Sequence, residues 1–358
     1  MTKILAFPAL LLVFLFSCGE TAQQLQRELM PAASGEVGEM ILVIDSTHWS
    51  GGLGSQLRKT FRAPMEGLPQ DEPMYAVNKV NPKRLNNLLK TASNMIFVMT
   101  LDSKTDESRL MRGYFTNQSL KKIQRDSSLW MTVNKDEFAK GQVVMYLFGQ
   151  DEEQLIDKLQ KNQGQLQNYF EGIAQARIQE KLFKSRELEA ERAIRQSQDV
   201  SIKVPFGWDL AKNLRNFSWL RFLEVDKELN VFIYQEPYKS AEVFDDVPAL
   251  RDQITETYLR DAEKPDIYIE RQKIDGEFIK VFEDRISFNG QYAVKNRSLW
   301  KISNNSGGGP YISYTILDEG KQTIYYIEGY VYSPGTDKKN WIRQVDAVLA
   351  TFNSSPGG

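Results

Sequence analysis

The chain of 358 residues contains a single cysteine, Cys18, and a single histidine, His48. One thiol cannot form a disulfide within the chain, and one thiol with one imidazole cannot complete a Cys/His zinc site. The stability of the folded part must therefore come from packed apolar cores, which a chain of this length can supply. We expect no metal site and no cofactor, and little chemistry of the kind that relies on these two residue types.

The charge balance bears on the class of partner. Lysine and arginine number 45, aspartate and glutamate number 47, and the formal net charge is -2. A nucleic-acid-binding domain would carry a clear excess of basic residues, so we do not expect nucleic acid as a partner. Hydrophobic residues make up 41% and charged residues 26% of the chain, both near the averages of globular proteins. The length of 358 residues is enough for two ordinary domains or one large one.

The first residues have the pattern of a bacterial lipoprotein signal. Lys3 precedes an apolar run from Ile4 to Phe16, which is too short for a membrane-spanning helix because such a helix needs about 20 apolar residues. The run leads into Leu15-Phe16-Ser17-Cys18, which resembles the lipobox, the motif whose cysteine becomes the acylated N-terminus. We predict a signal peptide over residues 1–17 and a lipid on Cys18. The alternative is an ordinary secretory signal that happens to contain a cysteine.

Residues 18–38 are polar with many small side chains and are predicted to form a flexible tether. Each buried methylene of an acyl chain contributes about 0.8 kcal/mol of membrane affinity, so several acyl chains on one cysteine make attachment effectively permanent. Gly19 follows the cysteine, whereas aspartate at this position retains enteric lipoproteins in the inner membrane. We therefore expect a lipid anchor in the outer membrane, with the protein facing the periplasm or the cell surface.

The rest of the chain divides into two predicted domains joined by a helical segment. Residues 39–150 alternate buried-type strands, such as Met40–Ile44 and Met95–Leu101, with short helices, which is typical of an α/β layered domain. Residues 151–198 contain no proline and carry apolar residues at helical spacing, which predicts a long connecting helix or, as the alternative, two helices.

Residues 199–358 hold short strands separated by turn residues, as in an antiparallel sheet. The domain ends in a helix whose apolar positions Trp341, Val345, Val348, Leu349 and Phe352 form one stripe. We therefore predict an α+β protein of two layered domains joined by a long helix, the second domain being an antiparallel sheet with packing helices.

Two segments resemble a known family. Leu68-Pro69-Gln70-Asp71-Glu72-Pro73 is similar to the conserved stretch of a Bacteroidetes lipoprotein family defined as a domain of unknown function (DUF 4837). The polar helix that leads into Val204-Pro205-Phe206-Gly207-Trp208 resembles the same family. The resemblance covers nearly all of the chain after the signal and implies no activity, cofactor or catalytic residue. Ser93-Asn94 departs from the family, which often places an arginine before a buried strand.

A second resemblance concerns the fold of the second domain alone. The opening Val204-Pro205-Phe206-Gly207-Trp208 and a terminal helix that ends in Ala350-Thr351-Phe352 are similar to the Mog1/PsbP-like α/β/α sandwich. This resemblance implies an architecture and no function.

His48 lies in Asp45-Ser46-Thr47-His48, directly after a buried-type strand. Ligands of α/β sheets gather at such strand ends, and a Ser–His–Asp set could be drawn from these residues. Triad members need a specific mutual geometry that neighbours in sequence rarely supply. We therefore expect a polar turn with a surface or hydrogen-bonded histidine, and we assign no catalytic residue.

The aromatic strand near the C-terminus is the candidate binding surface. Alternation along a strand places Tyr326, Tyr330 and Tyr332 on one face. Exposed aromatic side chains favour recognition of sugars or proteins, whereas tyrosines half-buried in a sheet are the alternative. We expect a non-enzymatic binding or assembly component of the envelope, with an envelope protein or a glycan as partner. The alternative function is an envelope hydrolase that uses carboxylate residues.

The lipid anchor can be tested directly. Changing Cys18→Ala removes the thiol that carries the acyl chains, so we expect loss of palmitate labelling and accumulation of the uncleaved precursor. Metabolic labelling and the intact mass of the purified protein measure both effects. Unchanged labelling and an unchanged mature mass would contradict the prediction.

Overall fold

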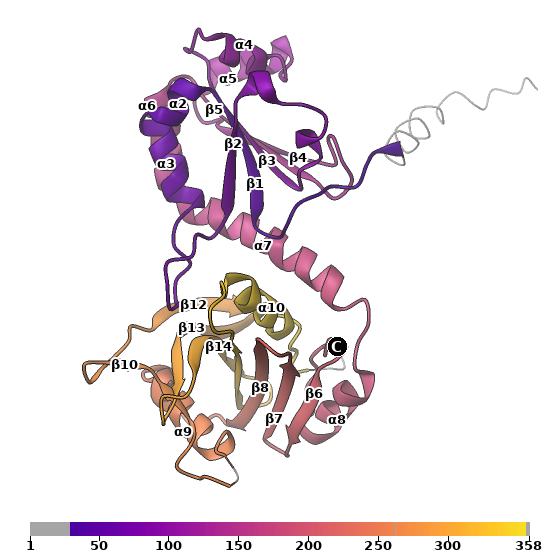
Figure 1. Ribbon diagram of the computed structural model, residues 1–358, viewed down its shortest axis with the longest axis vertical. Coiled ribbons are helices and arrows are strands. Elements are labelled where there is room, and N and C mark those ends of the chain that lie inside the picture. The colour runs from indigo at the N-terminus through magenta and orange to yellow at the C-terminus, as the bar shows by residue number, and fades with distance from the viewer. Residues whose placement is uncertain (1–28, 262, 356–358) are drawn as a thin grey trace, which may run out of the picture. The chain divides into compact units, whose positions relative to one another are not determined.

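The computed structural model describes residues 29–261 and 263–355 (Figure 1). The predicted signal peptide, Cys18 and the first part of the predicted tether lie outside the described residues. The described residues form two compact units, one made of those up to Gln56 together with Val77–Lys161, the other of Leu57–Ala76 together with those from Asn162. Within the described residues, no helix is both long and apolar enough to cross a membrane.

The first unit is built on a five-stranded sheet with the order β2-β1-β3-β5-β4. The central strands β1 (Glu39–Ile44), β3 (Asn94–Thr100) and β5 (Val143–Gly149) run parallel. The edge strands are β2 (Ala76–Val80) and β4 (Met131–Lys135), of which β4 runs antiparallel to β5. Every residue of β3 and β5 is buried, which explains why these strands read as continuous apolar runs rather than as alternating patterns.

Helices cover the sheet of the first unit. On one face, α4 (Asp106–Arg112) and α5 (Asn117–Arg125) pack Met111 and Ile123 against Phe97 and Tyr146 of the sheet. The remaining elements of this part are α2 (Ser46–Ser50), the first half of α3 (Gly52–Phe61), α6 (Glu152–Lys161) and the short 3-10 helices η1 (Pro82–Arg84) and η2 (Leu89–Thr91). The prediction of an α/β layered domain is confirmed.

The segment 151–198 is helical but is divided into three helices. They are α6, α7 (Gln163–Leu182) and α8 (Leu188–Gln198), so the long helix is present as the 20 residues of α7 and is shorter than predicted. The backbone leaves helical geometry at Asn162. At the second break, the N–H of Glu187 donates to the carbonyl of Val204, a bond that replaces the hydrogen bond of a continuing helix.

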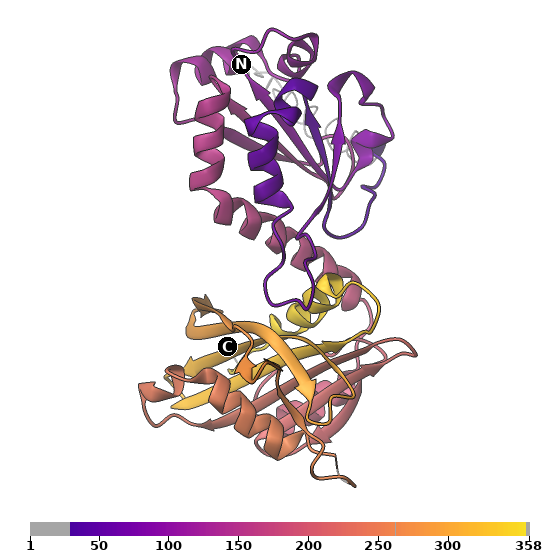
Figure 2. The ribbon, with the colours of Figure 1, turned by 60° about the vertical axis from the view of Figure 1, so that its left-hand side comes forward.

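The second unit contains an eight-stranded antiparallel sheet with the order β12-β13-β14-β15-β8-β7-β6, and β9 pairs with β13 beside this path (Figure 2). The strands are β6 (Asp209–Asn213), β7 (Phe217–Leu223), β8 (Glu228–Pro237), β9 (Ile269–Arg271), β12 (Phe282–Phe288), β13 (Gln291–Ile302), β14 (Gly308–Asp318) and β15 (Thr323–Tyr332). A separate small hairpin joins β10 (Lys273–Ile274) to β11 (Glu277–Phe278).

Helices pack on both faces of this sheet. One face carries α8 and α10 (Lys339–Leu349), and the other carries η3 (Ala241–Phe244) and α9 (Val247–Tyr258). The predicted apolar stripe of the terminal helix is confirmed, since its members from Val345 to Phe352 are buried and Trp341 is partly buried. Gly329 allows α10 to approach β15 closely, because a Cβ atom there would lie 2.7 Å from Val345.

A carboxylate from a distant segment caps α10. Glu72 is buried, and its two oxygens accept the backbone N–H groups of Lys338 at 2.7 Å and Lys339 at 2.9 Å. The capping residue of the helix itself, Lys338, supplies no side-chain hydrogen bond. A second acid, Glu171 of α7, pairs with Arg343 on the same helix. These contacts explain why Leu57–Ala76 and α7 belong to the second unit.

Removing the cap should destabilise the second unit. Changing Glu72→Ala leaves two N–H groups at the start of α10 without an acceptor, so we expect a loss of about 1–2 kcal/mol in the free energy of unfolding. Urea unfolding followed by circular dichroism measures this difference. The neighbouring exposed acid provides the matched control, Asp71→Ala, which should leave stability unchanged. Equal midpoints for the two variants would contradict the role of Glu72.

Candidate functional site

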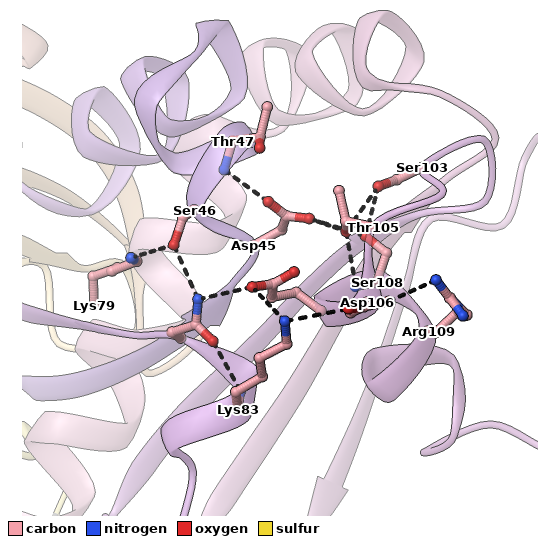
Figure 3. A network of polar contacts seen from close by, with 12 residues as sticks. Asp45, Ser46, Thr47, Lys79, Lys83, Ser103, Thr105, Asp106, Ser108 and Arg109 are labelled. Carbon is pink, nitrogen blue, oxygen red and sulfur yellow. Dashed lines mark hydrogen bonds and ion pairs between the residues drawn. The ribbon is translucent and has the colours of Figure 1, made fainter.

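The carboxyl ends of β1 and β3 mark the point where the strand order of the first sheet reverses. The chain passes from β1 to β2 on one side and then returns to β3 on the other. Ligands of open α/β sheets bind outside the carboxyl ends of the strands at such a reversal. We call the residues gathered there the switch-point edge: Asp45–Thr47 after β1, Lys79–Lys83 at the end of β2 and after it, and Ser103–Arg109 after β3 (Figure 3).

Asp45 is the buried centre of this edge. One of its carboxylate oxygens accepts the N–H of Thr47 at 2.7 Å and so caps α2. The other accepts the hydroxyls of Thr105 and Ser108, which belong to the loop after β3 and to α4 (Figure 3). Burial alone would raise the pKa of Asp45, but the hydrogen bonds from Thr105 and Thr47 outweigh it and lower the pKa. The carboxylate is therefore ionised at neutral pH and ties the two strand ends together.

Ser46 carries the exposed hydroxyl of the edge. Its oxygen accepts a hydrogen bond from the ammonium of Lys79 at 3.0 Å and another from the carboxamide of Asn81 at 3.0 Å (Figure 3). Because the oxygen already accepts twice, its own proton is available to donate to a ligand. The exposed position thus offers the hydroxyl of Ser46 together with the ammonium of Lys79.

Charged side chains surround this position. Lys83 lies 3.5 Å from Asp106 and 3.4 Å from Glu107, and Arg109 lies 2.6 Å from Asp106. These ion pairs are exposed to solvent and are therefore screened, so they orient the side chains more than they stabilise the fold. Lys79 differs from Lys83 because its ammonium donates to a neutral hydroxyl rather than to a carboxylate. Its positive charge can therefore pair with a negatively charged ligand.

His48 belongs to a separate, buried hydrogen-bond chain. Its Nδ1 atom lies 3.0 Å from Oε2 of Glu152, and its Nε2 atom lies 3.1 Å from the hydroxyl of Thr100. The other oxygen of Glu152 accepts the N–H of Leu53 at 2.9 Å. The order hydroxyl, imidazole, carboxylate is that of a catalytic triad. However, Thr100 is 0% exposed at the end of β3, so no substrate carbonyl can reach its oxygen in this arrangement.

Asp45, Ser46 and His48 do not form the Ser–His–Asp set that the sequence allowed. Asp45 bonds Thr105 and Ser108, while Ser46 bonds Lys79, and the imidazole of His48 turns to other partners. The expectation of a hydrogen-bonded histidine agrees with this geometry. Sequence reasoning missed the partners of His48 because they lie 52 and 104 residues away, and no local pattern marks them.

The three tyrosines of β15 do not form an exposed surface. They share one face of the strand, as alternation predicted, but this face packs against α9 and η3. Tyr326 is 0% exposed, Tyr330 is 3% exposed, and Tyr332 is partly buried. The prediction of an open recognition surface at these residues is therefore wrong. The structure supports the alternative of tyrosines buried in the sheet.

A buried ion pair lies beside these tyrosines. Arg251 of α9 donates two hydrogen bonds of 2.8 Å to the carboxylate of Glu328 on β15, and Tyr326 donates a third at 2.6 Å. The guanidinium also stacks over the ring of Tyr311 at 4.1 Å. Because Arg251 and Glu328 are enclosed by the core, the pair fixes α9 on the sheet. Among the described residues, no group of three or more His, Cys, Asp or Glu side chains is arranged to hold a metal ion.

Comparison with known families divides the chain in two. Residues 187–351 match the family model described as "Domain of unknown function (DUF4837)", and residues 33–183 match "Domain of unknown function (DUF8532)". Both matches are domains of unknown function. The resemblance to the first family is thus supported for the second half of the chain, whereas Leu68–Pro73 lies in the part matched by the other family.

Two further comparisons add no functional information. A solved structure described as "Crystal structure of human STARD10" is similar over 46% of this chain and 75% of that chain, with 11% sequence identity and a TM-score of 0.20. A similarity at this score supports no argument about the fold. The comparison with curated proteins gave no match.

The role of Asp45 predicts a pH effect. Because the pKa of Asp45 is lower in the folded protein than in the unfolded chain, where it is about 3.9, its ionised form stabilises the fold above about pH 4. This contribution is lost as the pH falls through the folded pKa. Changing Thr105→Val removes a donor, so the folded pKa should rise and the loss should begin at a higher pH.

A carboxyl-detected NMR titration of Asp45, with urea unfolding at several pH values, measures both effects. The matched control is Thr116→Val, because Thr116 caps α5 as Thr105 caps α4 but does not contact Asp45. It should destabilise the protein without moving this pKa. An unchanged Asp45 titration in the Thr105 variant would contradict the assignment.

Proposed function

We propose that the protein is a lipid-anchored component of the bacterial outer membrane that binds an acidic envelope glycan at the switch-point edge without catalysing a reaction. The signal pattern that ends at Cys18 supports the anchor. The observation that carries the binding role is the open donor set of Ser46 and Lys79 at the carboxyl ends of parallel strands.

The chemistry of the edge suits a sugar that carries a negative charge. The hydroxyl of Ser46, whose oxygen accepts from Lys79 and Asn81, can donate its proton to an oxygen of a polyol ligand. The ammonium of Lys79 adds a positive charge whose hydrogen-bond partner is neutral. A carboxylate or phosphate on the glycan would pair with this ammonium through a charge-assisted hydrogen bond.

The groups most suited to acid–base chemistry are engaged in holding the edge together. The carboxylate of Asp45 accepts three hydrogen bonds, and the imidazole of His48 is held between Thr100 and Glu152. A general base must instead reach a proton of the substrate within hydrogen-bond distance. This engagement supports binding rather than catalysis at the edge.

A glycan array tests the proposal. The mature protein is applied to neutral oligosaccharides and to matched oligosaccharides that carry uronic acid or phosphate groups. We expect binding to the acidic members, with at least a tenfold loss of affinity in Lys79→Ala, because the ammonium supplies the charge. The control Lys121→Ala removes an equal charge from the exposed surface of α5 and should bind as the wild type does.

The same array separates binding from catalysis. A variant with His48→Gln should keep its affinity, because the imidazole is buried behind the edge. Binding that is equal for neutral and acidic glycans, or that survives in the Lys79 variant, would contradict the proposed site. Release of shortened glycans by the wild type would contradict the non-catalytic role.

A further inference from the structure

The second unit carries an open cleft of about 560 Å³ at the C-terminal end of α3, which we call the basic cleft. Three of its lining residues are basic, namely Arg58, Lys59 and Arg62, against a single acid, Asp71. The whole chain has a formal net charge of -2, so this local excess of positive charge runs against the overall balance. The proposed glycan site uses none of these residues.

Two of the three cations are free to bind an anion. Lys59 and Arg62 are exposed, and within the part of the chain that the structure describes neither side chain forms an ion pair or a hydrogen bond. Arg58 is half-buried and has a contact of its own. Lys59 and Arg62 therefore give up no internal partner when they bind a negatively charged group.

The backbone beneath these cations is held in place. The apolar residues of the cleft are Ala63, Pro64 and Pro73. Pro64 pairs with Pro73 in an antiparallel bridge, and the N–H of Met74 donates to the carbonyl of Ala63 at 2.8 Å. Glu72, the neighbour of Pro73, is fixed on α10 by its two hydrogen bonds. Binding at this cleft would therefore cost little backbone entropy.

The competing explanation is that the cations only stabilise the helix that carries them. Arg58 and Lys59 lie in the last turn of α3, where positive charge interacts favourably with the helix dipole. This explanation accounts for the position of these charges. It differs from a binding role in one respect, because it predicts no dependence of the cleft on an external anion.

The predicted lipid anchor indicates which anion the cleft meets. Leu29 is the first described residue and follows Cys18 by eleven positions. An extended chain spans at most about 3.5 Å per residue, so Leu29 lies within about 40 Å of the anchored cysteine. Tethering raises the effective concentration of lipid headgroups around the protein. A few cations, too weak to hold a free protein on a membrane, are then sufficient to dock an anchored one.

We propose that the basic cleft docks the anchored protein on its membrane by binding the phosphate groups of anionic phospholipids. Lys59 and Arg62 would donate charge-assisted hydrogen bonds to phosphate oxygens, and the guanidinium of Arg62 can do so with two parallel bonds. The inference rests on the lipid anchor of the proposed function. It does not depend on the glycan site, which lies in the first unit.

Hydrogen–deuterium exchange on vesicles tests the proposal. The lipidated mature protein is incorporated into vesicles of phosphatidylcholine alone and into vesicles of phosphatidylcholine and phosphatidylglycerol in equal parts. We expect at least twofold slower exchange across residues 58–73 on the anionic vesicles, and loss of this difference in Lys59→Glu and in Arg62→Glu. The control Lys239→Glu changes an exposed charge of the second unit outside the cleft and should keep the difference.

The outcomes separate the docking from the anchor. Equal exchange on the two kinds of vesicle, or a difference that persists in the Arg62 variant, overturns the docking and leaves the anchor intact. Failure of the protein to stay on either kind of vesicle contradicts the anchor and the docking together. Inorganic phosphate is added to the protein without vesicles as a further sample. Equal protection in that sample would assign the cleft to a soluble phosphate and overturn the proposal.

Discussion

The carboxylate of Asp45 is the interaction on which the polar edge of the first unit depends. It caps α2 after β1 and accepts hydroxyls from the loop after β3 and from α4, so it joins two strand ends across the reversal of the sheet. The exposed hydroxyl of Ser46 and the ammonium of Lys79 lie beside this buried centre. Because the hydrogen bonds of Asp45 hold the strand ends in place, a ligand that binds Ser46 and Lys79 would cost the protein little conformational entropy.

The second unit uses buried and partly buried acids in a similar way. Glu72 caps α10, Glu171 pairs with Arg343 on that helix, and Glu328 holds Arg251 of α9. In each case one carboxylate fixes a helix to a segment distant in sequence. The cost of burying the charge is offset by several short hydrogen bonds, which a single exposed ion pair would not supply. These four acids therefore serve the architecture of the two units.

Local patterns were sufficient to predict the buried strands and the terminal helix, but not the partners of these elements. β3, β5 and α10 are buried elements. Burial requires apolar side chains, so the apolar runs of the two strands and the apolar stripe of the helix are visible in the sequence. The ends of α7 were not predicted because no proline marks them. The break between α7 and α8 depends on the hydrogen bond from the N–H of Glu187 to the carbonyl of Val204, a residue that is distant in the sequence. Alternation placed Tyr326 and Tyr330 on one face correctly. It could not show that helices cover both faces of β15, so the inferred surface was wrong.

The central claim is that the switch-point edge binds an acidic glycan without cleaving it. Hydrogen–deuterium exchange of the mature protein, with and without an acidic oligosaccharide, tests this claim most directly. The mass of the oligosaccharide is followed in the same samples. The account predicts slower exchange at residues 45–48 and 79–83 of the first unit, and an oligosaccharide of unchanged mass. Protection confined to the second unit, no protection at all, or cleavage of the sugar would contradict it.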